Sequence, residues 1–480
     1  MPPYLPVELL LPIFTQIRDE PDSLLFPNLN LFSCSLVCRF WYQCAFPLLL
    51  EGNNLYLNRD INKHTNLQLR RLADLMTESK RYGLSHAMLV EWVEIVVSKL
   101  FVPRLHTKGL DRRRIGMIDR LLRALQPQLN IIGLNLEGIS KPNEIRNLHD
   151  IVSKLLPSLD SVATLRITHL SSFPPLEPKG LLCTFKPFAS SSSKSPPIPP
   201  PHPILPLIQR LAPTLQHLHL TSAKLTPPIL QTLRACPNIR TTRFHRISYK
   251  VTPTDFADTV AAWPNLQHLS ILHPETYIPL GETIALLASS RPTLQTLDLD
   301  NSGAQEPDSV YHNLRTLLHH SALTLTSLTL PAPSNVPGPA TSPETSNALF
   351  AFLVTLPLPN LDTLDLSLLG ETLTSAPMVD TSPTSSATPL PWPSLRRLDT
   401  AGCSALSPAF LRAVITDCPR LEVVRTSFIH REYDEVQTVL TEGGFVRREN
   451  RGEWVGMGQP WVKYRPGSYR GFVGFDAYGY

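Results

Sequence analysis

Along most of the chain, leucine and other apolar residues recur in the spacing Leu-x-x-Leu-x-Leu, beginning near residue 131. In a strand the second and third of these residues share one face, because successive side chains alternate, and the polar residues between them face outward. A helical pattern then follows each copy and ends at a proline, as at Pro237 and Pro419. Since no single strand–helix unit can bury its own apolar face, the pattern predicts a stack of such units. The clear copies are Ile131/Leu134/Leu136, Val162/Leu165/Ile167, Leu215/Leu218/Leu220, Leu266/Leu269/Ile271, Leu294/Leu297/Leu299, Leu325/Leu328/Leu330 and Leu361/Leu364/Leu366, and the weaker ones are Ile239/Thr242/Phe244, Leu395/Leu398/Thr400 and Leu421/Val424/Thr426.

Two shorter patterns of helical spacing precede this array, between residues 5 and 41. In the first, Pro6 suits an opening helical turn, where its missing N–H would have no partner, and Glu8 suits the positive end of the helix dipole. The apolar residues that follow form a stripe wide enough to bury. The pattern predicts two short amphipathic helices, one face of which must dock on another surface. Their apolar stripes are Leu9, Leu10, Ile13, Phe14 and Ile17 in the first helix and Leu31, Cys34, Val37, Cys38 and Trp41 in the second.

Between these helices and the array, residues 48–130 show three further helical patterns, around 67–76, 88–100 and 115–125. We therefore expect residues 48–130 to form a helical linker or the N-terminal cap of the array. The array itself should then occupy residues 131–442.

Three stretches rich in proline, serine and threonine interrupt the array, at about 171–206, 331–345 and 374–391. Such a composition cannot bury a core, so we expect disordered insertions. Residues 443–480 are rich in glycine, aromatic residues and arginine. A C-terminal cap followed by a tail is the preferred interpretation, and stacking on single-stranded RNA is the alternative.

The composition narrows the classes of partner and compartment. The chain has 480 residues, of which 42% are apolar, and a net charge of +4, so neither nucleic acid nor a membrane is expected as a partner. No signal peptide is evident at the N-terminus, and the most apolar later segment, 89–102, is short and interrupted by charges. The seven cysteines are scattered and odd in number, which favours a reducing compartment, the cytoplasm or the nucleus.

Motifs for chemistry are not evident in the sequence. A glycine-rich phosphate loop ending in Gly-Lys-Ser/Thr and a Gly-x-Ser-x-Gly nucleophile elbow are both missing. Cys34, Cys38 and Cys44 have no histidine near them, and we interpret them as buried thiols rather than zinc ligands. We therefore expect no catalytic residue, no metal and no cofactor, and the chain is not expected to be an enzyme.

The N-terminal pattern resembles an F-box. The opening Leu-Pro-x-Glu-Leu-Leu-x-x-Ile-Phe, followed by Ser-Leu-Val-Cys-Arg-x-Trp, carries the resemblance over residues 1–47. It implies a helical module that binds a Skp-family adaptor and through it a cullin–RING ubiquitin ligase. The connection between Phe14 and Leu31 is longer than is usual in that family, and an ordinary helical hairpin that caps the next domain is the alternative. The residues that the resemblance assigns to adaptor binding are Leu5, Pro6, Glu8, Leu9, Leu10, Ile13, Phe14, Leu31, Leu36, Val37, Cys38 and Trp41.

The array resembles a divergent leucine-rich repeat of the kind that follows an F-box. It departs from regular repeats because it lacks their asparagine ladder, for which Cys403 is the nearest equivalent. The fold class implied is α/β: an N-terminal helical F-box followed by a leucine-rich-repeat solenoid with disordered insertions. An unrelated α/β domain with leucine-rich strands is the alternative.

Together the two resemblances imply a substrate-recognition subunit of a Skp–cullin–F-box ubiquitin ligase, whose repeat array presents its strand face to a protein substrate. An interaction scaffold that is not coupled to ubiquitination is the rival hypothesis. The sequence does not identify the substrate, because the exposed strand positions show no readable pattern.

A reducing compartment predicts free thiols throughout the chain. Alkylation of the denatured, unreduced protein from cells should therefore modify all seven cysteines, which mass spectrometry can count. Protection of any pair would indicate a disulfide and contradict the predicted compartment.

Overall fold

The computed structural model describes residues 6–19, 34, 38–52, 65–81, 87, 90, 92–103, 108–126, 129–139, 142–170, 202–249, 252–272, 280–290, 294–299, 307–330, 343–367, 389–401, 403, 407–426, 433–447 and 453–456. The chain divides into two compact units, residues 1–292 and 293–480. Both contain helices and strands, and in both the strands of the repeat array lie parallel to one another.

The N-terminal helices are α1 (Val7–Asp19) and α3 (Arg39–Gly52), which pack against each other. The ring of Phe14 meets that of Trp41 edge to face, with ring centroids 5.3 Å apart. This geometry is favourable for aromatic pairs, so it fixes the two helices side by side. Their common core contains Leu10, Phe14, Cys44, Ala45 and Leu48, with Ile17, Cys34, Phe40 and Trp41 at its margin.

Two more helices, α4 (Asn66–Arg81) and α5 (Arg112–Leu125), pack together before the repeats. The Asp111 side chain accepts a hydrogen bond from the Arg114 N–H at 2.9 Å, and so satisfies one of the open donors at the start of α5. The predicted helical patterns at 67–76 and 115–125 are thus confirmed.

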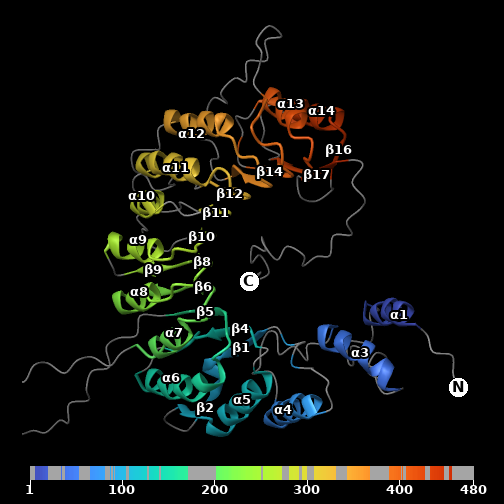
Figure 1. Ribbon diagram of the computed structural model, residues 1–480, viewed down its shortest axis with the longest axis vertical. Helices are drawn as coiled ribbons and strands as arrows, with labels where there is room; N and C mark the ends of the chain where they lie inside the picture. Colours follow the sequence, from blue (N-terminus) through green and yellow to red (C-terminus); the bar gives the residue numbers. More distant parts are fainter. Residues whose placement is uncertain are drawn as a thin grey trace, which may run out of the picture. The chain divides into compact units, whose positions relative to one another are not determined.

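The first unit contains a parallel sheet in the order β1-β4-β5-β6-β8-β10, and Figure 1 shows helices following one another along one side of it. Each helix connects one strand to the next, which is the arrangement that the alternating strand and helix patterns predict. The strands are β1 (Trp92–Val96), β4 (Ile131–Asn135), β5 (Thr164–Thr168), β6 (His217–Thr221), β8 (Thr241–His245) and β10 (His268–Leu272). The helices beside them are α6 (Pro142–Leu155), α7 (Leu205–Leu211), α8 (Pro227–Arg234), α9 (Pro253–Ala261) and α10 (Leu280–Ser290).

Short elements complete this unit: the 3-10 helices η3 (Val97–Leu100) and η4 (Leu156–Ser158), the antiparallel pair β2 (Phe101–Pro103) and β3 (Lys108–Leu110), and the parallel pair β7 (Lys224–Leu225) and β9 (Ser248–Tyr249).

The strand positions alternate between the core and the outer face, as the pattern predicts. In β6, Leu218 and Leu220 are buried, whereas His217, His219 and Thr221 lie on the opposite, outward face. Even the weaker copies follow this rule, since Thr242, Thr400 and Thr426 take leucine positions and are buried. Threonine replaces leucine there because it is β-branched and suits a strand.

The helix predicted at 88–100 is wrong. Its central residues form strand β1, which pairs in parallel with β4 and is followed by the 3-10 turn η3. Val90, Val93 and Ile95 are buried in the spacing of the repeat, so this segment is a copy that the leucine pattern missed. Valine and isoleucine favour strands, and this local preference wins over the helical spacing.

The predicted frame of the next copy is also shifted. The strand register aligns Ile132 with Leu165 of β5 and Leu134 with Ile167, so this copy begins two residues earlier than predicted. The buried positions of this copy are Leu129, Ile132 and Leu134. Because residues 129, 131, 132, 134 and 136 are all apolar, the sequence fits either frame, and only the pairing with β5 decides between them. The domain limits at 47, 130 and 442 themselves stay a prediction.

The second unit continues the repeat pattern and ends in an antiparallel hairpin. Its strands follow the order β11-β12-β13-β14-β15-β17-β16, in which β15 pairs in parallel with β14 and antiparallel with β17. Trp454 in β17 is buried and covers the sheet beside β15. The strands are β11 (Thr296–Leu299), β12 (Ser327–Thr329), β13 (Thr363–Asp365), β14 (Arg397–Thr400), β15 (Val423–Thr426), β16 (Phe445–Arg447) and β17 (Glu453–Gly456), and the helices are α11 (Pro307–Ser321), α12 (Pro343–Thr355), α13 (Pro408–Asp417) and α14 (Tyr433–Glu442).

In several repeats, the side chain immediately before the first leucine forms a hydrogen bond to the repeat before it. Thr214 donates its hydroxyl to the Val162 carbonyl at 2.9 Å, and Thr324 donates to the Leu294 carbonyl at 2.7 Å. In other repeats an asparagine takes this place and donates its amide to a nearby carbonyl, as Asn360 does to Leu323 at 2.7 Å. These side chains satisfy loop carbonyls that neighbouring strands do not reach. The array thus has a polar ladder at the start of its strands, at a different position from the asparagine ladder of regular leucine-rich repeats.

The three expected insertions lie mostly outside the described residues. Within the first, however, residues 202–206 are described, and Ile204 and Leu205 are buried where α7 begins. Residues 343–345 already belong to α12, and Leu390 is buried before β14. The described structure therefore resumes earlier at each site than the composition predicts, and in the first and third insertions buried apolar residues stand at that point. Residues 457–480 of the expected tail also lie outside the described residues.

Stacked leucines should dominate the stability of the second unit. Leu364 is fully buried in β13, and we expect Leu364→Ala to lower the free energy of unfolding by roughly 2–5 kcal/mol, because it leaves a cavity. Thermal melting should show a decrease of several degrees. The matched control is Leu323→Ala, because Leu323 is 72% exposed in the same unit, and it should leave the melting temperature nearly unchanged. Equal effects of the two substitutions would contradict the assigned core.

Candidate protein-interaction sites

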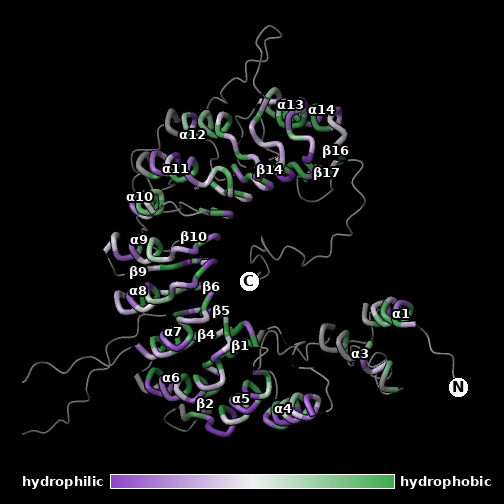
Figure 2. Tube along the Cα trace, in the orientation of Figure 1, coloured by the Kyte–Doolittle hydropathy of each residue, from purple (hydrophilic) through white to green (hydrophobic). Residues whose placement is uncertain are grey.

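Helix α1 has two apolar faces rather than one. Leu10 and Phe14 are fully buried against α3, whereas Leu9 and Ile13 are 53% and 43% exposed. Figure 2 shows α1 in mostly hydrophobic colours. Leu9 and Ile13 share one exposed side, which we call the outer row, whereas Val7 and Leu11, at 37% and 41% exposure, flank the buried stripe on its other side. Since large exposed apolar residues rarely cluster on one helix without a partner, the outer row is a candidate docking surface.

The local sequence explains why α1 begins where it does. The carbonyl of Pro6 accepts hydrogen bonds from the Leu9 and Leu10 N–H groups at 3.0 and 3.1 Å, while Pro6 has no N–H of its own to leave unsatisfied. Glu8 lies exposed in the first turn, where the helix dipole favours a negative charge. The predicted start of this helix is confirmed.

Cys38 is not the buried thiol that we predicted. It is exposed and precedes α3, where its sulfur accepts a hydrogen bond from the Trp41 N–H at 3.5 Å and its carbonyl accepts one from Tyr42 at 2.8 Å. Since Cys38 stands before the first residue of α3, it does not share the buried face of that helix. Cys44 is buried as predicted, and burial raises the pKa of its thiol, as does the proximity of Cys38.

The sequence-predicted adaptor residues therefore fall into three groups. Leu10, Phe14 and Trp41 come together in the core between α1 and α3. Pro6, Glu8, Leu9, Ile13 and Cys38 are exposed. Leu5, Leu31, Leu36 and Val37 lie outside the described residues. The assignment of all twelve to adaptor binding stays a prediction, and the sequence pattern alone could not separate the buried members from the exposed ones.

The outward strand face of the first unit carries arginine and histidine. The register places Arg166 of β5, His219 of β6 and Arg243 of β8 side by side. Burial lowers the pKa of His219 to about 3, and the charges of Arg166 and Arg243 contribute to this shift. The pKa of His217 is also lowered, by burial and by Arg240, so both imidazoles are neutral at pH 7.

The outward strand face of the second unit carries carboxylates instead. Asp298, Thr329, Asp365 and Asp399 occupy one row across β11 to β14, and Arg425 of β15 pairs with Asp399 at 3.2 Å. Burial raises the pKa of Asp365 to about 6, and the charge of Asp399 contributes. Sequence reasoning missed both rows, because a row depends on the register between segments that are far apart in the chain.

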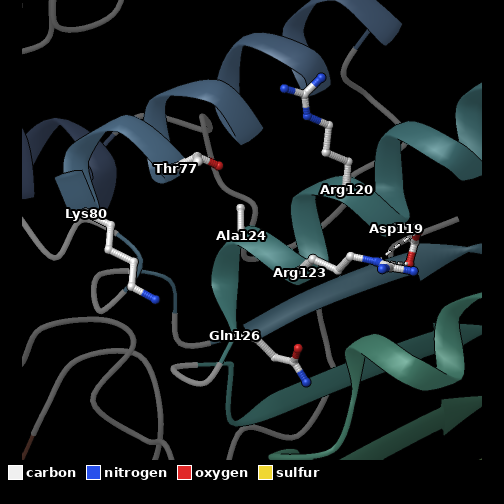
Figure 3. Close-up of a pocket in the computed structure, with 7 residues that line it drawn as sticks. All are labelled: Thr77, Lys80, Asp119, Arg120, Arg123, Ala124 and Gln126. Carbon is white, nitrogen blue, oxygen red and sulfur yellow. Dashed lines mark hydrogen bonds and ion pairs between the residues drawn. The ribbon is translucent and has the colours of Figure 1, made fainter.

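A pocket of about 600 Å³ opens between α4 and α5, and Figure 3 shows its lining. Arg123 pairs with Asp119 at 3.1 Å, while Arg120 pairs with Asp74 of α4. The side chain of Lys80, from α4, also lines the pocket. Both arginines are thus paired with carboxylates of the protein itself. The small side chains of Thr77 and Ala124 also line the pocket.

Within the described residues, no group of three or more histidine, cysteine, aspartate or glutamate side chains is arranged to hold a metal ion. The helices described by the structure also include none that is both long and apolar enough to cross a membrane.

Comparison with known proteins identifies the N-terminal module. Residues 3–50 match the F-box-like family, which confirms the resemblance drawn from the sequence. Among solved structures, the chain is similar to one in the Rad7 and Elc1 complex of yeast, with 14% sequence identity, a TM-score of 0.43 and coverage of 79% of this chain and 81% of that chain. No curated protein sequence matches the chain.

The raised pKa of Asp365 predicts a pH dependence of stability. Because the folded state disfavours its charged form, its contribution is most favourable below its ordinary pKa near 3.8 and is lost as the pH rises through about 6. Asp365→Asn should therefore stabilise the protein at pH 7.5 by up to about 3 kcal/mol and flatten the profile of melting temperature between pH 4 and 7. Glu442→Gln, at the exposed end of α14, is the control and should leave the profile unchanged. A lower melting temperature of the Asp365→Asn variant at pH 7.5 would refute this account.

Proposed function

We propose that the chain is the substrate-recognition subunit of a Skp–cullin–F-box type ubiquitin ligase, in which the F-box-like module at residues 3–50 binds a Skp-family adaptor. The outward strand faces of the repeats would then bind the protein substrate. The observation that carries the proposal is the outer row on α1, an apolar helix face left exposed within the segment that matches the F-box-like family.

The buried and the exposed apolar residues of α1 have different roles, and this supports adaptor binding. Leu10 and Phe14 hold α1 on α3 and keep the helix in shape without a partner. Leu9 and Ile13, one helical turn apart, stand on the exposed side. An amphipathic helix that presents such anchors is a common way for one protein to dock into a groove of another. The outer row would be covered in the complex and would provide its apolar contact.

The strand faces support a role in binding rather than in catalysis. Their outward side chains come from successive repeats, so they form an extended surface of the kind that repeat proteins use for partners. In this proposal the ligase machinery performs the chemistry, and the chain contributes proximity by holding the substrate near it. A location in the cytoplasm or nucleus, where such ligases act, is part of the proposal.

The outer row gives a sharp test of adaptor binding. The double variant Leu9→Asp, Ile13→Asp should lose copurification with a Skp-family adaptor, because buried carboxylates cost several kcal/mol, a large part of the roughly 10 kcal/mol of a 10⁻⁷ M complex. Its melting temperature should stay close to that of the wild type, since both positions are exposed. Leu10→Asp should instead unfold the α1–α3 pair and lose binding through that route.

Gln43→Asp is the control, since it adds a charge at an exposed polar position of α3, and it should keep the adaptor. Retention of the adaptor by the double variant would refute the assigned binding face. Capture of the adaptor without a cullin would favour the scaffold hypothesis over the ligase.

A further inference from the structure

Several arginines on the helix side of the first unit are paired within the protein. Arg210 of α7 forms an ion pair with Asp160 at 2.8 Å. Arg234 at the end of α8 meets Asp255 and Asp258 of α9 at 3.4 and 3.6 Å. Each of these guanidinium groups lies between neighbouring repeats, where a carboxylate from the adjacent repeat receives it.

Three arginines around β8 differ from Arg210 and Arg234. Arg240 precedes the strand, Arg243 lies on its outward face and Arg246 follows it with φ at +51°. Arg240 and Arg246 are exposed, and Arg243 is half-buried. None of the three forms a salt bridge with a carboxylate in the part of the chain that the structure describes.

The neighbouring strands provide no carboxylate either. The outward residues of β5 and β6 are threonine, arginine and histidine, and those of β10 are histidine, serine and leucine. The register sets His217 beside Thr241 and His219 beside Arg243. Neutral imidazole can donate a hydrogen bond to an acidic group without adding charge, so these histidines complement the arginines.

The spacing of the arginines indicates which kind of anionic ligand they suit. Arg240 and Arg243 lie near enough to the outward residues His217 and His219 for their charges to lower the pKa values of these imidazoles. The backbone from Arg240 to Arg246 covers at most about 20 Å, since each residue of an extended strand adds roughly 3.3 Å. Tight recognition of a single phosphate relies on donors that converge on one group. Arginines that are spaced along a strand suit several carboxylates of an extended polypeptide better than they suit a single phosphate.

We propose that Arg240, Arg243 and Arg246, which we call the guanidinium row, bind an extended acidic segment of the protein substrate, with His217 and His219 as hydrogen-bond donors beside them. This inference rests on the proposed function, in which the strand face binds the substrate. A single-stranded nucleic acid fits less well, because the outward positions of β5, β6, β8 and β10 hold no Phe, Tyr or Trp on which bases would stack.

The test uses the full chain and a fluorescent peptide of about twelve residues with glutamate at every third position and glycine or serine between. Fluorescence anisotropy should show binding that weakens with added salt, since the contacts are partly exposed ion pairs. The triple variant Arg240→Glu, Arg243→Glu, Arg246→Glu should bind at least about tenfold more weakly. The matched control carries Arg71→Glu, Arg112→Glu and Arg113→Glu, three exposed arginines of α4 and α5, and should bind like the wild type.

If the triple glutamate variant does not fold, Arg240→Gln, Arg243→Gln with Arg246→Asn replaces it, because asparagine tolerates the left-handed backbone at residue 246. Equal losses in the row variant and the control would show an effect of net charge alone and overturn the inference. So would tighter, row-dependent binding of a peptide with one phosphoserine or of poly(U).

The adaptor assay distinguishes this inference from the proposed function. A chain that copurifies with adaptor and cullin but does not bind the peptide would refute the guanidinium row only. A chain that binds the peptide through the row but captures no cullin would refute the ligase role and leave the row in place.

Discussion

The whole array depends on one constraint: a short strand with a helix behind it cannot bury its own leucines. Leu297, Leu328, Leu364 and Leu398 lie in register on consecutive strands, and all four are buried. This mutual burial fixes the inward positions and the parallel register together. The outward positions are less constrained by packing and can carry charge: Arg166 and Arg243 lie there in the first unit, and a row of aspartates lies there in the second.

The sequence predicted the parts of the fold that follow from local patterns. Copies with leucine at all three positions were found, and so were those in which Thr242 or Thr400 fills a leucine position, because the surrounding spacing was intact. Val90, Val93 and Ile95 escaped notice because their segment also fits a helix, and the frame at Ile131 was ambiguous because the residues of both possible frames are apolar. In each case the deciding information is a strand pairing, which involves residues far away in the chain.

For the candidate sites, too, local patterns predicted only part of the structure, and long-range packing decided the rest. The residues of α1 were identified from their spacing, but a stripe that contains Leu9, Leu10, Ile13 and Phe14 is wider than one contact face, and only the packed structure separates the buried pair from the exposed pair. Cys38 was misjudged because a helical pattern was extended over residues that precede the helix. The guanidinium row and the acidic row of the second unit have no signature in a single repeat, since they exist only when several strands are aligned.

The polar ladder at the start of the strands also has a direction. Thr214, Asn238, Thr324 and Asn360 each donate to a carbonyl of the preceding repeat, and the backbone follows the same rule where Arg240 donates its N–H to Gln216. During synthesis the N-terminal repeats leave the ribosome first, so every new repeat meets acceptors that are already in place. The nascent chain can therefore pack each new repeat onto the folded repeat before it, in the order in which the repeats are translated.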